Sequence, residues 1–290
     1  MKPCVTLITP VYNQAQYLEE YINCILEQTF RPLQVIFVDD GSSDGSGNIL
    51  TTAAKEGPWD DISVEVITSE HRGQAHAMNM ALPRVMGELL TWCDADDLMH
   101  PKSIEIKADY LLEHPEDDMV RTNGTVFNLD LGEETGEYAS PEDKVRKKLF
   151  DELLYDRTYC YAGTYMIRTK LFFACYPNRQ IPESTEGQNL QMLLPPASRS
   201  YCGYCDEKLH TYRVHSDSHS KRRRTYAEAL LRTKNFTKLR LKLLEYCDCD
   251  VNRYTKEIMW IEKSSMKSLL KTAARKVRED SGDDIEKNSK

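Results

Sequence analysis

Six aspartates follow two short apolar runs near the start of the chain, and their spacing could serve chemistry. The runs are residues 35–38 and 89–93, and the aspartates are Asp39, Asp40, Asp44, Asp94, Asp96 and Asp97. Carboxylates this close to one another repel, and their burial costs free energy unless a counter-charge is present. A divalent cation is the usual partner because it prefers oxygen ligands. The two clusters therefore indicate a site for a metal ion and a phosphorylated ligand.

The segments around these aspartates alternate between strand and helix patterns. The expected strands are residues 5–8, 35–38, 64–67 and 89–93, and the expected helices are residues 15–28, 44–54, 74–86 and 101–113. Such alternation with short links predicts a parallel sheet with right-handed crossovers. Because ligands bind at the carboxyl ends of parallel strands, we expect both aspartate clusters to line one crevice.

Beyond residue 115 the pattern is less regular. We expect strands at 123–127 and 161–167, an acidic loop at 130–141, and an irregular or weakly β segment at 201–212. Helices are expected at 144–155, 185–194, 226–246 and 252–277, and Pro195 is expected to end the second of these. Residues 280–290 are polar and are expected to fray.

The composition fits a soluble globular protein and argues against some functions. Of the 290 residues, 40% are hydrophobic and 29% are charged, and the net charge of −8 argues against nucleic acid as a partner. No apolar run reaches transmembrane length, and residues 1–5 lead into a strand without a secretory signal. Nine cysteines, an odd number, fit reduced thiols better than a disulfide framework. We therefore expect a cytoplasmic protein.

Four motifs then occur in a recognisable order. They are Pro-Val-Tyr-Asn at 10–13, Val-Asp-Asp-Gly-Ser-Ser-Asp at 38–44, Arg-Gly-Gln-Ala-His-Ala-Met-Asn at 72–79 and Asp-Ala-Asp-Asp at 94–97. In order and spacing they resemble the signature blocks of family 2 glycosyltransferases. The resemblance is strongest over residues 1–115 and continues more weakly through 187–189 to 212–220. It implies an α/β GT-A fold, a Rossmann-like nucleotide-diphospho-sugar transferase domain with a central, mostly parallel sheet.

The resemblance also implies how the chain is divided. Residues 1–222 would form the GT-A domain, with a nucleotide-binding half at 1–115 and an acceptor half at 116–222. Residues 223–290 would form a helical C-terminal extension with a frayed tail. Within it, the basic and amphipathic stretch 266–278 fits a helix on an anionic membrane, and it equally fits a helix packed on the domain or on a partner.

By resemblance, six residues would hold the nucleotide: Thr9, Pro10, Tyr12, Asp40, Arg72 and Asp94. Asp40 would accept a hydrogen bond from the base, typically uracil, and Tyr12 would stack on it. Asp94 would face the ribose or the neighbouring phosphate. Arg72 would lie near the diphosphate, although a surface salt bridge is an equally good reading of that residue.

The same resemblance implies a metal site. Asp96 would ligate Mg²⁺ or Mn²⁺, both of which suit carboxylate and phosphate oxygens. In the stretch 212–220, His215 matches the histidine that completes the metal shell in the family, and His219 is close enough to compete. The alternative is a structural role for both histidines. The basic run 221–224 that follows could meet the diphosphate or a phosphorylated lipid acceptor, or could simply begin a solvated helix.

The general base is where the chain departs from the family. The family has a Glu-Asp pair at the start of a helix, and here the aligned pair is Gln188 and Asn189. Amides do not take up a proton at neutral pH, so the usual base is absent. Glu183 and Glu186 lie just before this helix and are the candidates, with Glu183 slightly favoured. Both could instead be surface charges.

The implied function is an inverting, metal-dependent glycosyltransferase of hexosyl or N-acetylhexosaminyl type. It would move a sugar from a nucleotide-diphospho sugar, such as a UDP-sugar, to a glycan or lipid-linked glycan acceptor in cell-surface polysaccharide or lipopolysaccharide biosynthesis. Such a protein would be cytoplasmic, with peripheral contact at the inner face of the plasma membrane as an open question. The oligomeric state is also open.

Two other functions are alternatives to a glycosyltransferase. A non-catalytic sugar-nucleotide-binding partner of a glycan assembly complex is supported by the amides at 188–189, and it predicts nucleotide binding without turnover. A nucleotidyltransferase would need a glycine-rich, basic loop after its first strand, where this chain has Thr-Pro-Val-Tyr-Asn at 9–13. The second rival is therefore the weaker.

Overall fold

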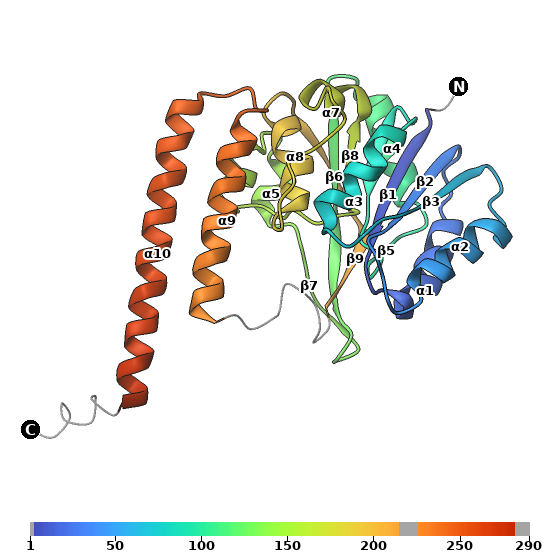
Figure 1. Ribbon diagram of the computed structural model, residues 1–290. Coiled ribbons are helices and arrows are strands. Elements are labelled where there is room, and N and C mark those ends of the chain that lie inside the picture. Colours follow the sequence, from blue (N-terminus) through green and yellow to red (C-terminus); the bar gives the residue numbers. More distant parts are fainter. Residues whose placement is uncertain (1–2, 215–224, 282–290) are drawn as a thin grey trace, which may run out of the picture.

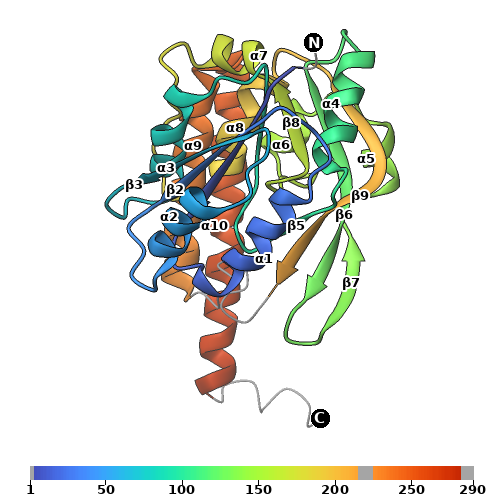
Figure 2. The same cartoon turned by 90° about the vertical axis from the view of Figure 1, so that its right-hand side faces the viewer.

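A computed structural model describes residues 3–214 and 225–281, with side chains described as far as residue 273. A mixed sheet with helices on both faces forms the body, and two long helices stand beside it (Figures 1 and 2). The strands are β1 (Val5–Val11), β2 (Leu33–Asp39), β3 (Ile62–Thr68), β4 (Leu89–Trp92), β5 (Leu98–Met99), β6 (Met119–Asn128), β7 (Glu133–Glu137), β8 (Tyr165–Arg168) and β9 (Cys202–Val214). The helices are α1 (Ala15–Leu26), α2 (Ser46–Glu56), α3 (Gln74–Ala81), the 3-10 helix η1 (Leu82–Arg84), α4 (Ser103–Glu113), α5 (Pro141–Val145), α6 (Phe150–Leu154), α7 (Thr169–Cys175), α8 (Gln188–Ala197), α9 (Tyr226–Leu244) and α10 (Val251–Ser281).

The first part of the chain builds the parallel half of the sheet, in the order β3-β2-β1-β4. β1 and β2 are buried along their whole length, as expected for apolar strands covered by helices on both faces. Val5 of β1 pairs with Leu33 of β2 on one side and with Leu89 of β4 on the other. Parallel pairing brings the carboxyl ends of these strands to one edge of the sheet. The predicted parallel sheet is therefore confirmed.

The second half of the sheet is largely antiparallel, and one of its strands corrects the sequence prediction. β8 is antiparallel to β4 and to β6, while β9 is parallel to β6. The segment expected to be irregular or weakly β at 201–212 is β, and it forms the long strand β9, whereas the expected loop at 130–141 contains β7. β7 is polar and exposed throughout, so it lacks the alternation by which a strand is recognised. Main-chain pairing with β6 holds it.

Two predicted helices also have different bounds. The stretch 144–155 contains the end of α5 and the whole of α6, because the chain leaves the helical conformation at Arg146. α8 continues through Pro195 to Ala197 instead of ending at Leu194. Pro195 has no N–H for the carbonyl of Gln191 one turn earlier. The hydroxyl of Tyr176 donates to that carbonyl instead, at 2.6 Å, so a tertiary contact allows the helix to continue.

The two C-terminal helices share the core of the domain. α9 and α10 lie side by side and antiparallel, on the outer side of α8 (Figure 1). Leu239 and Leu243 of α9 are buried in the same hydrophobic cluster as Trp92 of β4 and Leu190 of α8. The domain boundary at residue 222 stays a prediction. Among the described residues, no helix has both the length and the apolar character needed to cross a membrane.

Candidate active site

Asp40 ties the end of β2 to the turn before α3. Its amide donates to the carbonyl of Val11 at 2.8 Å, and its carboxylate is almost fully buried. The carboxylate accepts hydrogen bonds from the backbone amides of Arg72 at 3.0 Å and Gly73 at 2.8 Å, and it lies 2.8 Å from Nδ1 of His71. The turn uses a positive φ of 95° at Gly73, which glycine adopts without strain. Asp40 thus fixes the backbone of Arg72 and Gly73 at the carboxyl end of β2.

The three residues predicted to line the base pocket differ in exposure. Thr9 is buried, and its hydroxyl lies 2.6 Å from the hydroxyl of Tyr21 in the core. Pro10 is buried as well. Tyr12 is 42% exposed and stacks on the ring of His71, with ring centroids 3.8 Å apart and planes at 15°. Tyr12 and His71 therefore form a flat aromatic pair beside Asp40. His71 had no motif of its own to mark it, although it directly precedes Arg72.

The second aspartate cluster lies at the end of β4. Asp94 is half-buried, and burial together with the negative charge of Asp96 raises its pKa to about 7. Nε2 of Gln74 donates to Oδ1 of Asp94 at 3.3 Å, which links this cluster to the start of α3. Burial and the charges of Asp96 and Asp94 also raise the pKa of Asp97. The mutual repulsion argued from the sequence is thus present in the fold.

Asp97 has a structural role that the sequence leaves open. Its carboxylate accepts the backbone amide of Arg213 at 2.9 Å, and the guanidinium of Arg213 donates to the carbonyl of Asp96. Nε2 of His210 lies 3.5 Å from the same carboxylate. Burial and the charge of Lys107 lower the pKa of His210 to about 3, so this histidine is neutral. These contacts hold β9 against the aspartate cluster.

The donor set suits a hard divalent cation. Asp94 and Asp96 offer carboxylate oxygens, and the pKa of Asp94 is raised by its burial and by the negative charge of Asp96, which a cation would offset. Within the residues that the structure describes, no group of three or more His, Cys, Asp or Glu side chains is arranged to hold a metal ion. His215 and His219, the predicted additional ligands, lie outside the described residues, as does the basic run 221–224.

Glu183 is brought to Arg72 from a distant part of the chain. Its carboxylate accepts a hydrogen bond from Nη2 of Arg72 at 3.0 Å and lies 3.0 Å from Nδ1 of His76. The hydrogen bond with His76, with help from the charge of Arg72, lowers the pKa of Glu183. The amide of Asn79 fixes the backbone before Glu183, since it both donates to and accepts from Ile181 at 2.9 and 2.8 Å. Glu183 and Asn79 also line a cavity of about 430 Å³.

Glu186 and the amide pair lie at the start of α8. Oε2 of Glu186 accepts a hydrogen bond from Nε of Arg232 at 3.1 Å, so this glutamate is linked to α9. Oδ1 of Asn189 accepts the indole N–H of Trp92 at 2.7 Å, which puts the residue aligned with the family base directly behind the second aspartate cluster. The side chain of Gln188 is buried, and its amide has no hydrogen-bond partner in the described structure.

The comparison with protein families identifies the chain. The family described as "Glycosyl transferase family 2" matches residues 6–176. The chain belongs to this family. The GT-A fold inferred from the four motifs is confirmed, including the mostly parallel sheet of the first half and the C-terminal helices.

The curated relatives match only part of their own length. TuaG of Bacillus subtilis, a glycosyltransferase proposed to act in teichuronic acid biosynthesis, is 34% identical over 112 residues. The match covers 39% of this chain and 43% of TuaG. The chain spans less than half the length of the curated relatives that it matches. Family membership therefore rests on the shared domain.

Two solved structures share the fold over most of the chain. The structure of S. aureus TarS residues 1–349 with UDP-GlcNAc has a TM-score of 0.65 and 17% identity, covering 92% of this chain and 73% of TarS. The mannosyltransferase PcManGT from Pyrobaculum calidifontis, with GDP-Man and Mn²⁺, has a TM-score of 0.62 and 19% identity, covering 95% and 76%. At these identities the likeness concerns the fold.

Proposed function

We propose that this family 2 domain transfers a sugar from a nucleotide-diphospho sugar, with a UDP-sugar as the favoured donor, to a hydroxyl of a glycan, with inversion and with a divalent metal ion.

 The observation that carries the proposal is a continuous set of contacts at the carboxyl ends of the parallel strands. Asp40 holds the turn that bears Arg72, Gln74 at the start of α3 reaches Asp94, and Arg72 reaches Glu183. These contacts join groups that suit a nucleobase, a diphosphate and an acceptor hydroxyl in one site.

The donor would lie along the edge formed by β1, β2 and β4. The exposed ring of Tyr12, backed by His71, offers a flat surface for the base. Asp94 would face the ribose or the neighbouring phosphate, and Arg72 would meet the diphosphate through a charge-assisted hydrogen bond. TarS binds UDP-GlcNAc and PcManGT binds GDP-Man, which supports a nucleotide-sugar donor for the same fold.

Asp96 would hold Mg²⁺ or Mn²⁺, with His215 or His219 as a further ligand. Such an ion supplies positive charge to the leaving diphosphate. Burial and the negative charge of Asp96 raise the pKa of Asp94, and a cation at this place would offset that charge, which supports this assignment. PcManGT carries Mn²⁺.

Glu183 is the favoured general base. In the described state the hydrogen bond with His76 and the charge of Arg72 keep the pKa of Glu183 low, and a carboxylate with a low pKa is a weak base. When Arg72 turns to the diphosphate of a donor, Glu183 loses one of these neighbours and its pKa rises. Donor binding would thus activate the base. Glu186, which is tied to Arg232, is the second candidate.

The acceptor would be a glycan or lipid-linked glycan of the cell surface, and the reaction would take place in the cytoplasm, where nucleotide sugars are available. The likeness to TuaG, with its proposed part in teichuronic acid biosynthesis, supports a cell-surface product. The acceptor would reach the site from the side of α8.

One observation favours the non-catalytic alternative. The residue aligned with the family base is an amide, and its oxygen is engaged by Trp92. A sugar-nucleotide-binding partner of an assembly complex would need no base at all. This alternative predicts donor binding without hydrolysis or transfer.

Hydrolysis of a panel of nucleotide sugars with Mn²⁺ or Mg²⁺ tests the proposal. The native chain is compared with Asp96→Ala, Glu183→Gln and Glu186→Gln, and with Asp60→Ala at an exposed control position. We expect one donor to be turned over by the native chain. Asp96→Ala and Glu183→Gln should lose this turnover, and the control Asp60→Ala should keep it.

The remaining outcomes separate the alternatives. Loss of turnover in Glu186→Gln alone would make Glu186 the base. Donor binding with no turnover, even when a panel of glycan acceptors is supplied, would favour the non-catalytic protein. Failure to bind any nucleotide sugar would contradict both functions.

A further inference from the structure

The outer face of α10 carries an unusual mixture of side chains. The helix packs on α9 with one face, where Tyr254 and Ile258 are buried. The opposite face exposes four lysines and three large apolar residues, namely Lys256, Met259, Trp260, Lys263, Lys267, Leu270 and Lys271. Their spacing of three and four residues aligns them along one side of the helix. We call this set the outer stripe.

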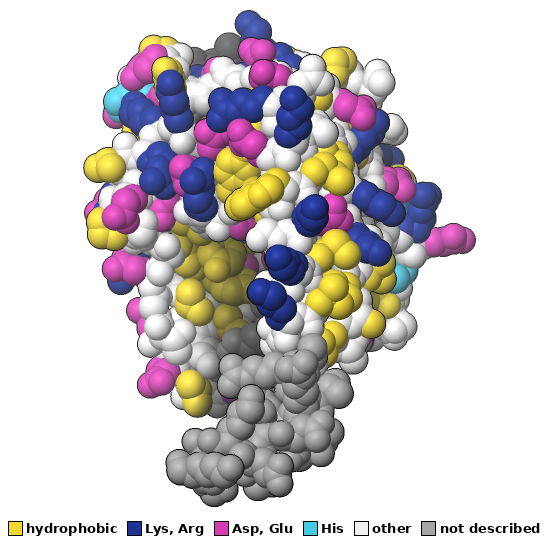
Figure 3. Space-filling view, turned by 90° about the vertical axis from the view of Figure 1, so that its left-hand side faces the viewer, with side chains coloured by type: hydrophobic (Ala, Val, Ile, Leu, Met, Phe, Trp, Pro, Cys, Tyr) yellow, Lys and Arg dark blue, Asp and Glu magenta, His cyan; other side chains and the backbone are white. Residues whose placement is uncertain are grey.

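The charge of the outer stripe opposes that of the chain. The chain has a net charge of −8, yet the outer stripe contains no acidic residue. The four lysines have no ion-pair partners among the described residues, whereas nearby Arg253 pairs with Glu257 at 2.9 Å. Figure 3 shows Lys and Arg side chains gathered beside hydrophobic ones on this face of the molecule. The stripe is therefore available to an anionic partner.

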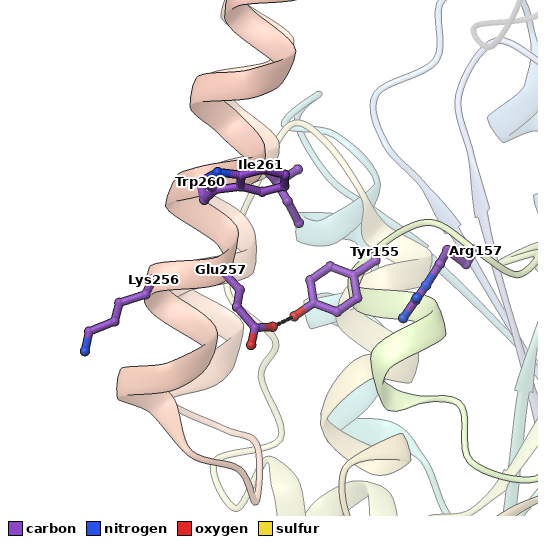
Figure 4. A pocket seen from close by; sticks show the side chains of 6 residues that line it. All are labelled: Tyr155, Arg157, Lys256, Glu257, Trp260 and Ile261. Carbon is purple, nitrogen blue, oxygen red and sulfur yellow. Dashed lines mark hydrogen bonds between the residues drawn. The ribbon is translucent and has the colours of Figure 1, made fainter.

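The apolar residues of the stripe are exposed on the same side of the helix as the lysines. Trp260 is 71% exposed, Leu270 is 56% exposed and Met259 is 47% exposed. Trp260 also borders a cavity of about 490 Å³ between α10 and the end of α6, lined in addition by Tyr155, Arg157, Lys256, Glu257 and Ile261. Figure 4 shows Tyr155 reaching Glu257 across this cavity, while Lys256 points away from it.

The chemistry of the stripe distinguishes between partners. A second copy of the same stripe would bring lysines against lysines, which is unfavourable. A nucleic acid would engage the lysines but would leave the apolar side chains without a counterpart. An anionic bilayer satisfies both sets, because its phosphates attract lysines while tryptophan favours the headgroup region and leucine the adjoining acyl chains.

We propose that the outer stripe of α10 docks the protein on a bilayer that contains anionic phospholipid, with Trp260 in the headgroup region. The helix is already folded and held by α9, so docking requires no folding of this segment. Binding to a bilayer needs neither donor nor acceptor, so the proposal stands or fails independently of the transfer reaction.

Sedimentation of the full chain with vesicles tests the docking. One set of vesicles is phosphatidylcholine, and the other is equal parts of phosphatidylcholine and phosphatidylglycerol. We expect binding to the second set, and about tenfold weaker binding for Lys263→Glu/Lys267→Glu. The charge-matched control is Lys55→Glu/Lys102→Glu, two exposed lysines outside α10, and it should bind nearly as well as the native chain. Unchanged thermal unfolding of both variants shows that they are folded.

Fluorescence tests the depth of Trp260. The chain has three tryptophans, of which Trp92 is buried and Trp59 is half-buried. We expect a blue shift of the emission on anionic vesicles that is absent in Trp260→Phe, although this variant still sediments. The proposal is overturned if the native chain ignores anionic vesicles, or if the control variant loses as much binding as the stripe variant. It is also overturned if the stripe variant abolishes a dimer or nucleic-acid binding and leaves vesicle binding unchanged.

Discussion

At the scale of single residues, the pKa of Glu183 depends on the side chains that surround it. Glu183 has a lowered pKa because of its hydrogen bond with His76 and the charge of Arg72. Such coupling means that the basicity of Glu183 is set by its neighbours rather than by its own position. A base controlled in this way can be inactive until a donor displaces Arg72.

The pH dependence of donor hydrolysis should report this coupling. In His76→Leu the carboxylate loses its hydrogen-bond partner, so its pKa rises and the base becomes protonated at a higher pH. We expect the acidic limb of the profile of kcat/KM against pH to move to higher pH. His114→Leu, which removes an exposed histidine paired with Glu116, should leave the limb in place. An unmoved limb in His76→Leu would remove Glu183 as the base.

Gln188 provides a second prediction at this scale. Its buried amide has no partner in the described structure, and burial of an unpartnered polar group costs about 1–3 kcal/mol. If a substrate supplies the missing hydrogen bonds, Gln188→Leu should keep or gain stability while acceptor-dependent turnover falls. Urea unfolding and transfer assays measure the two effects. A loss of stability with unchanged turnover would show that the amide is structural.

At the scale of elements, buried polar contacts hold the start of α5 in place. Asp143 forms a capping box with Ser140 at the start of α5 and accepts the hydroxyl of Thr158. It also pairs with Arg121, which is fully buried, at 3.3 Å. Burial alone would raise the pKa of Asp143, but the hydrogen bonds from Thr158 and Ser140 outweigh it and lower the pKa.

Removal of this charge should cost stability in a pH-dependent way. A carboxylate with a lowered pKa stabilises the fold above its unfolded pKa, near 4, and this stabilisation is lost as the pH falls through the lower folded value. Asp143→Asn should therefore destabilise the protein by about 3 kcal/mol at neutral pH, with a smaller difference in acid. Urea unfolding at both pH values measures it. Glu142→Gln, at the exposed neighbouring position, should have little effect at either pH.

At the scale of the whole molecule, the C-terminal helices belong to the core that supports the site. Gly187, just before α8, has a φ of 68°, and a Cβ there would lie 2.8 Å from Leu239 of α9. Glu186 pairs with Arg232 of the same helix. The start of α8 and the candidate base region are therefore shaped in part by α9.

A chain truncated after residue 222 should fail to fold stably. It would lose five buried apolar side chains, Leu239, Leu243, Leu244, Tyr254 and Ile258. Each contributes about 2 kcal/mol, and together they match the whole stability of a typical domain, about 5–15 kcal/mol. Circular dichroism and thermal unfolding of the truncated chain measure the effect. A cooperative transition near that of the full chain would instead support a separable extension at 223–290.

The sequence by itself determined the features that depend on local patterns. Alternating strand and helix segments are encoded by apolar spacing and turn residues within short windows, so the parallel sheet and the aspartates at its strand ends could be predicted. The same information identified the family through four motifs. β7 escaped because a polar, exposed strand has no such pattern.

Only the tertiary structure decided which of these residues meet. Glu183 reaches Arg72 across 111 residues of sequence, and Asn189 reaches Trp92 across 97. The continuation of α8 through Pro195 depends on a hydroxyl from α7's end, Tyr176. Such contacts arise from the path of the folded chain and leave no periodic signal in the sequence. The partners of Glu183 and the exposure of one face of α10 are therefore properties of the fold.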